Sequence, residues 1–183
     1  LTSSSQLAKR LAEAGIDLAS LDLQNTADQL KKLESIQGQL PIGGIPTGKQ
    51  VFFGRKAACS SCHRVGSEGG KIGPDLSKVG ERRNERDLLE AVVFPNASIA
   101  RGFESHAILT ADGVNLTGLV VRETPESLFL RTNDQREIRL KRSEIEAQKP
   151  STISIMPAGL ENTMSRQELA DLLLFLESQD QLI

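Results

Sequence analysis

The chain lacks tryptophan and tyrosine altogether, and its 183 residues include only two cysteines, two histidines and six phenylalanines. So few cysteines exclude a disulfide-dense framework and a zinc site built from four thiolates. No apolar run approaches the roughly 18 residues that a membrane-spanning helix needs. Because aromatic rings are scarce, the bulk of a core must come from Leu, Ile and Val, or from a group that is not protein.

The charge balance is close to neutral, with 22 basic and 24 acidic side chains and a formal net charge of −2. A chain with 38% hydrophobic and 25% charged residues is typical of a folded globular protein. Nucleic acid and anionic lipid are not expected as partners of the whole chain. No signal segment follows Leu1, so we expect a mature protein or a piece of a longer one.

Helical patterns are expected at both ends of the chain. Residues 1–40 form a polar lead-in with one helix behind Ser3 and a second over Thr26–Ile36, separated by Gly15 and the region Asp22–Asn25. A turn-rich linker follows, and then a helix over 85–94. The last helix begins at a capping box over 165–168.

Between these helices, residues 104–149 alternate in the manner of short strands separated by turn residues. The expected strands are His106–Thr110, Val114–Arg122, Ser127–Thr132, Arg136–Leu140 and Ile145–Lys149. The order of helix, strand and helix predicts a small antiparallel β module inserted into an α domain. Five strands of this spacing can close into an SH3-like or Sm-like barrel. The predicted fold is therefore mainly α with an inserted β module.

The strongest chemical signal is the run Cys59-Ser60-Ser61-Cys62-His63. Two thiols at this spacing can bond to both vinyl groups of one haem, and the adjacent histidine then lies beneath the iron as a ligand. Three other interpretations are a zinc site, a thioredoxin-like redox pair and a structural disulfide. A zinc site lacks ligands, the redox pair lacks its βαβ context, and the disulfide would close a very short loop. The run therefore predicts one covalently attached haem c with its iron.

Residues around this motif resemble those of class I c-type cytochromes. The resemblance rests on Gly48–Phe53 before the motif, on Gly73-Pro74-Asp75-Leu76 after it, and on Ile155-Met156-Pro157 near the end. It implies that Cys59 and Cys62 carry the thioether bonds and that His63 is the proximal iron ligand. It further implies that the turn containing Pro74 and Leu76 supports His63, the Pro74 carbonyl binding its second ring nitrogen, and that Met156 is the distal ligand.

Other side chains are alternatives for these roles. Met164 competes with Met156 but directly precedes the last helix, and His106 is a further candidate for the sixth ligand. Arg82 is a candidate partner of a haem propionate. Residues 48–101 carry ten basic and six acidic side chains, an excess that either steers an acidic redox partner or is ordinary surface charge.

A narrower resemblance covers residues 48–178, including Thr117-Gly118-Leu119-Val120 and the run 154–160. It is to the haem-binding domain at the C-terminal end of large proteins from planctomycetes and their relatives. The expected division is a helical lead-in over 1–40, a cytochrome domain in two parts over 41–101 and 150–183, and the inserted module over 102–149.

These observations favour an electron-transfer domain over an enzyme. A single haem ligated by His63 and Met156 would pass electrons from a dehydrogenase-like donor to another redox carrier. The alternative is a peroxidase-like haem enzyme or gas sensor with an open sixth position, and the β module is either a cover or a partner-binding adaptor. The resemblance implies export, to the periplasm or beyond it, in a bacterium.

Overall fold

The computed structural model describes residues 18–132, 134 and 136–180. It divides into two compact units, one ending at Gln39 and one beginning at Leu40. In the first unit, helix α2 spans Leu18–Gln37. The helix runs through 22–25, where the sequence predicts a break, because the segment contains neither proline nor glycine. The helix expected behind Ser3 lies outside the described residues.

The second unit begins with helix α3 (Ile45–Phe53), which has Pro46 in its first turn. The one-turn helix α4 (Cys59–Cys62) follows, and then the short strands β1 (Arg64–Val65) and β2 (Glu68–Gly69) pair with each other. Helix α5 (Glu85–Val93) starts at Asn84, whose side chain forms a capping box with Asp87.

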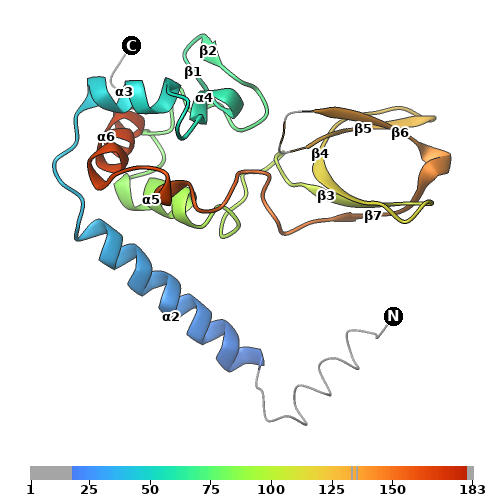
Figure 1. The fold of residues 1–183 in the computed structure, drawn as a ribbon, viewed down its shortest axis with the longest axis horizontal. Coiled ribbons are helices and arrows are strands. Elements are labelled where there is room, and N and C mark those ends of the chain that lie inside the picture. The colour runs from blue at the N-terminus through green and yellow to red at the C-terminus, as the bar shows by residue number, and fades with distance from the viewer. Residues whose placement is uncertain (1–17, 133, 135, 181–183) are drawn as a thin grey trace. The chain divides into compact units, whose positions relative to one another are not determined.

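After the inserted strands, the chain returns through the 3₁₀ turn η2 (Leu160–Asn162) to helix α6 (Arg166–Glu177) and the 3₁₀ turn η3 (Ser178–Asp180). Ser165 caps α6 in the predicted capping box with Glu168. Helices α3 and α6 lie side by side, so the first and last helices of this unit pack against each other (Figure 1).

The contact between α3 and α6 is unusually close at Gly48. A Cβ atom placed there would lie 2.0 Å from the carbonyl oxygen of Asp171 and 2.6 Å from the Cβ of Phe175. The Phe52 and Phe175 rings pack next to it with centroids 5.7 Å apart. Asp171 is buried, and its Oδ1 accepts hydrogen bonds from the Gly44 N–H at 2.7 Å and from Gln167. Glycine at position 48 therefore allows the two helices to meet.

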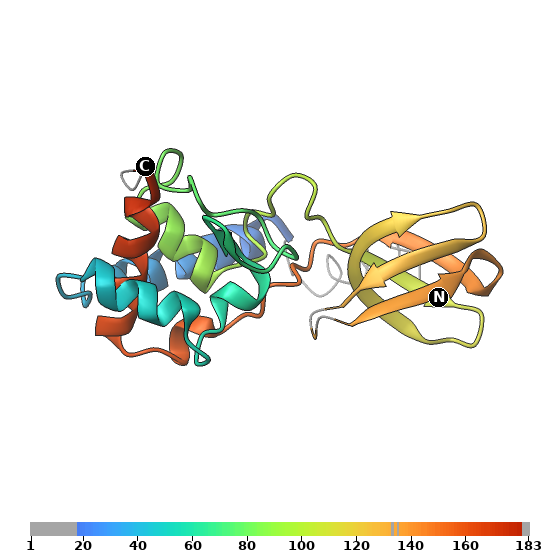
Figure 2. The same cartoon turned by 90° about the horizontal axis from the view of Figure 1, so that it is seen from above.

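The inserted strands form a five-stranded sheet in the order β6-β5-β4-β3-β7, and every neighbouring pair is antiparallel. The sheet is curved around its own apolar core (Figure 2), which consists of Ile108, Leu128, Leu130 and Leu140. The strands are β3 (His106–Thr110), β4 (Asn115–Glu123), β5 (Ser127–Arg131), β6 (Glu137–Lys141) and β7 (Ile145–Pro150). The 3₁₀ turn η1 (Arg142–Glu144) joins β6 to β7.

The predicted fold class, mainly α, is wrong. The described residues contain this five-stranded antiparallel sheet beside the helices, so they are not mainly α. The reason is that the β module has a core of its own, whereas α3 and α5 have only nine residues each and α4 only four. Among the described residues, no helix is long and apolar enough to cross a membrane.

Replacing Gly48 with Ala should destabilise the protein. Alanine favours a helix by about 1 kcal/mol over glycine, but overpacking costs about 1–3 kcal/mol and occasionally more. Because the obstacle is the backbone carbonyl of Asp171, we expect the clash to prevail and to lower the free energy of unfolding by about 2 kcal/mol. Urea unfolding measures the change. Gln50→Ala, at an exposed position of the same helix, is the control, and equal stability of the two variants would contradict the close contact.

Glu168 should contribute to stability in a pH-dependent way. A hydrogen bond from Lys56 (2.7 Å), followed by one from the Ser165 N–H, lowers the pKa of Glu168 to about 2. A carboxylate with a depressed folded-state pKa stabilises the fold above its unfolded pKa, and this contribution fades as the pH falls towards 2. We expect Glu168→Gln to have a lower free energy of unfolding than wild type at pH 7. Urea unfolding from pH 7 to pH 3 should show this difference shrinking below about pH 4.5. The difference in free energy of unfolding between Lys56→Gln and wild type should shrink in the same way. A difference that stays constant with pH for either variant would refute a pH-dependent contribution of Glu168.

Candidate functional site

The two cysteines and the adjacent histidine lie on and just after the single turn of α4. Ala58 precedes the turn in the left-handed region with φ of 51°, and the His63 N–H closes the turn on the Cys59 carbonyl at 2.9 Å. Both thiols are partly buried, and neither is in a disulfide. The local backbone therefore presents two free thiols and one imidazole from five consecutive residues.

Burial raises the pKa of the Cys59 thiol to about 11, with a smaller contribution from the neighbouring Cys62. A thiol with a raised pKa is protonated at neutral pH and is a poor nucleophile. This property does not suit the thioredoxin-like interpretation, in which one cysteine of the pair is a reactive thiolate. Among the described residues, no group of three or more His, Cys, Asp or Glu side chains could hold a metal ion, so a zinc site lacks support as well.

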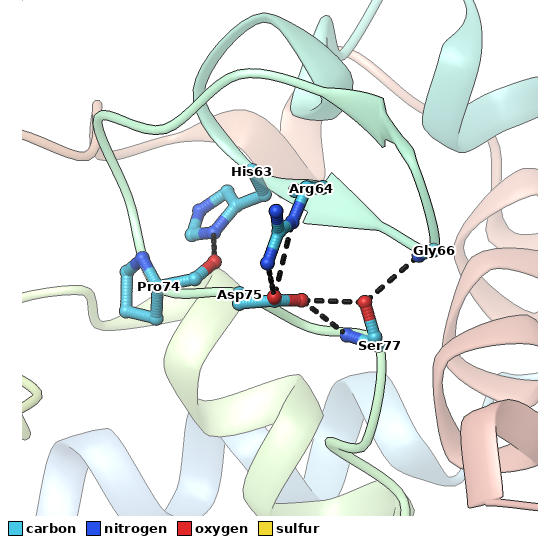
Figure 3. Close-up of polar contacts among 6 residues, drawn as sticks. All are labelled: His63, Arg64, Gly66, Pro74, Asp75 and Ser77. Carbon is cyan, nitrogen blue, oxygen red and sulfur yellow. Dashed lines mark hydrogen bonds and ion pairs between the residues drawn. The ribbon is translucent and has the colours of Figure 1, made fainter.

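The His63 ring is oriented by one hydrogen bond (Figure 3). Its Nδ1 lies 2.8 Å from the carbonyl oxygen of Pro74. A carbonyl oxygen only accepts, so Nδ1 carries the proton and Nε2 keeps its lone pair. Burial lowers the pKa of His63, against the opposing effect of the Pro74 carbonyl, so the neutral ring is favoured. A neutral imidazole with a free Nε2 is the form that binds a metal.

The loop from Arg64 to Leu76 folds back onto the motif. The Ile72 and Gly73 N–H groups both donate to the Cys62 carbonyl, and the Leu76 N–H donates to the Arg64 carbonyl at 2.8 Å. A Cβ at Gly73 would lie 2.5 Å from Cε1 of His63, so only glycine leaves room for the ring. The loop and the motif are thus one hydrogen-bonded unit.

The structure brings four of the predicted site residues together, namely Cys59, Cys62, His63 and Pro74. Leu76 is partly buried and belongs to the same loop through its N–H. Arg82 is exposed in the turn before α5. Met156 is partly buried in the segment between β7 and η2, while Met164 is buried immediately before α6. His106 begins β3 and pairs with β4 and β7 in the sheet.

An ion-pair network that is not predicted from the sequence lies beside the motif. Arg64 pairs with Asp75, and Asp75 accepts hydrogen bonds from the Ser77 hydroxyl at 2.5 Å and from its N–H at 2.9 Å. These bonds, led by that of the Ser77 hydroxyl and followed by that of Arg64, lower the pKa of Asp75 to about 2. The signal was present, because opposite charges directly follow His63 and Pro74 in the sequence.

A surface cavity of about 500 Å³ lies elsewhere, between the loop residues Lys71 and Ile72 and the sheet residues Val120, Arg122 and Arg131. None of the predicted cofactor-binding residues lines it. The donor set at α4, and not a cavity, therefore indicates a cofactor.

That donor set fits c-type haem, because it offers two free thiols for thioether bonds and a neutral imidazole with Nδ1 occupied. Residues 45–112 match the family model for cytochrome c. The match includes every predicted cofactor-binding residue except Met156, which lies beyond its end. This match implies covalently bound haem c with iron, and it supports a haem-binding electron-transfer protein with redox partners. The chain has no match among curated proteins.

Replacing Gly73 with Ala should displace the His63 ring. The added methyl would overlap Cε1 and Nδ1, so the ring or the loop must move and the hydrogen bond to Pro74 should be lost. In the haem-free protein, NMR should show the protected Nδ1–H of His63 in wild type and its exchange with water in Gly73→Ala. Gly113→Ala, which strains a turn with φ of 84° and meets no atom within 4 Å, is the control. A Nδ1–H that stays protected in Gly73→Ala would rule out this packing.

Proposed function

We propose that this chain is a monohaem c-type cytochrome domain that carries single electrons between a dehydrogenase-like donor and another redox carrier. Cys59 and Cys62 would hold the haem, and His63 and Met156 would ligate its iron. When bound, the haem iron supplies the one-electron redox chemistry. The observation that carries the proposal is the contact of the Pro74 carbonyl with Nδ1 of His63, next to two free thiols.

Two neighbouring interactions support Met156 as the distal ligand. The Met156 N–H donates to the Ser154 hydroxyl at 3.1 Å, and the Ser154 N–H donates to the Asn96 side chain at 2.8 Å. The segment that carries Met156 is thereby tied to the residues after α5. Met164 is only 7% exposed, so its side chain is buried in the protein core.

The identity of the partners and the place of action are further parts of the proposal. An acidic redox partner would suit the excess of basic residues around the motif. Export to the bacterial periplasm would suit a domain whose haem is attached covalently, and cytochrome c domains are typically exported in bacteria. The resemblance noted from the sequence over residues 48–178 supports the planctomycete-type C-terminal domain as the particular subfamily.

The visible spectrum and ligand binding test this function. Protein produced with a haem c attachment system should give a pyridine haemochrome spectrum with two thioether bonds. The ferrous protein should bind carbon monoxide slowly, because Met156 occupies the sixth position, and Met156→Ala should bind it at least about tenfold faster, since one coordination bond no longer has to break. Met164→Ala is the control and should behave like wild type.

Two results would contradict the proposal. The absence of a c-type spectrum would exclude covalent haem. Carbon monoxide binding to wild type as fast as to Met156→Ala would indicate an open sixth position, as in a haem enzyme or gas sensor.

A further inference from the structure

A network of side-chain bonds joins the residue after His63 to the residue after Pro74 (Figure 3). Arg64 donates to Oδ2 of Asp75 through Nη2 and, at 3.0 Å, through Nε. Oδ1 of Asp75 accepts from the N–H and the hydroxyl of Ser77, and the Ser77 hydroxyl accepts from the Gly66 N–H at 2.8 Å. Both carboxylate oxygens are therefore engaged, one by each side of the loop.

The position of Asp75 gives this network a direct effect on the histidine. The carbonyl that binds His63 belongs to the peptide between Pro74 and Asp75. Because a peptide unit is planar, the orientation of that carbonyl follows the conformation of Asp75 at its other end. The hydrogen bonds to the Asp75 carboxylate fix the conformation of this residue. They thereby limit how far the Pro74 carbonyl can rotate.

Backbone hydrogen bonds hold the loop on both sides of this peptide. The Gly73 N–H binds the Cys62 carbonyl before it, and the Leu76 N–H binds the Arg64 carbonyl after it. The carboxylate of Asp75 supplies the contact between these two anchors.

We propose that Asp75 is a positioning residue that, through Arg64 and Ser77, holds the Pro74 carbonyl on Nδ1 of His63 and so sets the donor strength of this axial ligand. The inference rests on the proposed function, because it concerns His63 as an iron ligand. A hydrogen bond to the outer nitrogen raises the basicity of a ligating imidazole. A more basic imidazole favours ferric iron, so loosening the Pro74 carbonyl should raise the reduction potential.

The size of the effect should be modest. Removing a direct hydrogen-bond partner of a metal-bound histidine changes metal affinity by about 10- to 100-fold. Asp75 does not contact His63 itself but acts through the Pro74 carbonyl, so its effect should be smaller. For the holoprotein of Asp75→Asn we expect about a threefold change in the ferric-to-ferrous ratio at fixed potential, an upward shift of about 30 mV at 59 mV per tenfold change. The Arg64–Asp75 pair is partly exposed, so Asp75→Asn should lower thermal stability only modestly.

The test compares variants that separate positioning from charge. Asp75→Asn removes one negative charge, and Glu81→Gln removes one from an exposed ion pair with Lys78 in the segment that follows this loop. Arg64→Gln removes a positive charge but breaks the same contact as Asp75→Asn. If the contact positions the carbonyl, Arg64→Gln and Asp75→Asn should both raise the potential. The double variant should shift it no further than the larger single shift. NMR of the ferric holoproteins should show the His63 ring resonances moving in the same variants.

Opposite shifts for Arg64→Gln and Asp75→Asn, cancelling in the double variant, would show a charge effect and overturn the inference. A shift in Asp75→Asn no larger than that in Glu81→Gln would also overturn it. Both results leave the proposed function intact, because they presuppose a wild-type protein with a normal c-type spectrum. Loss of that spectrum in wild type would instead refute the proposed function.

Discussion

The close contact between α3 and α6 organises the second unit of this protein. At Gly48 the backbone of α3 approaches the Asp171 carbonyl so closely that no side chain fits between them. Phe52 and Phe175 fill the space beside this contact, and Asp171 accepts the N–H at the start of α3. These helices are the first and the last in the sequence of the unit. Their contact therefore joins the chain before the haem motif to the chain after the β module. The sheet can then be inserted without interrupting the helical packing.

The functional site, in contrast, is built almost entirely from residues close together in sequence. One turn of helix carries both cysteines. The following loop folds back so that the Pro74 carbonyl accepts a hydrogen bond from Nδ1 of His63. This arrangement determines the tautomer and, together with burial, the neutral charge state of the ring. The glycine at position 73 and the Arg64–Asp75–Ser77 network serve this geometry from either side of the Pro74 peptide.

Several parts of the fold could be predicted because their causes are local. The strands of the β module begin and end within two residues of their predicted bounds, since alternating apolar residues and turn pairs such as Asp112-Gly113 act over a few positions. The capping box at Ser165 is equally local. The prediction of a mainly α fold is wrong although the length of α5 is predicted to within one residue, because the nine residues of α3 and the four of α4 add little helix beside five strands. The break predicted at 22–25 was also wrong, since polar residues alone do not end a helix.

The sequence by itself determined the chemistry of this protein: two cysteines at haem-binding spacing, one adjacent histidine, and too few rings to fill a core. These are properties of residue type and spacing, which folding does not alter. Only the tertiary structure decided which atoms meet. Whether the Pro74 carbonyl reaches Nδ1, how far Cys59 is buried, and whether Asp75 pairs with Arg64 depend on how the loop folds back. Such contacts arise from distances and burial between segments, and no pattern in the linear chain specifies them.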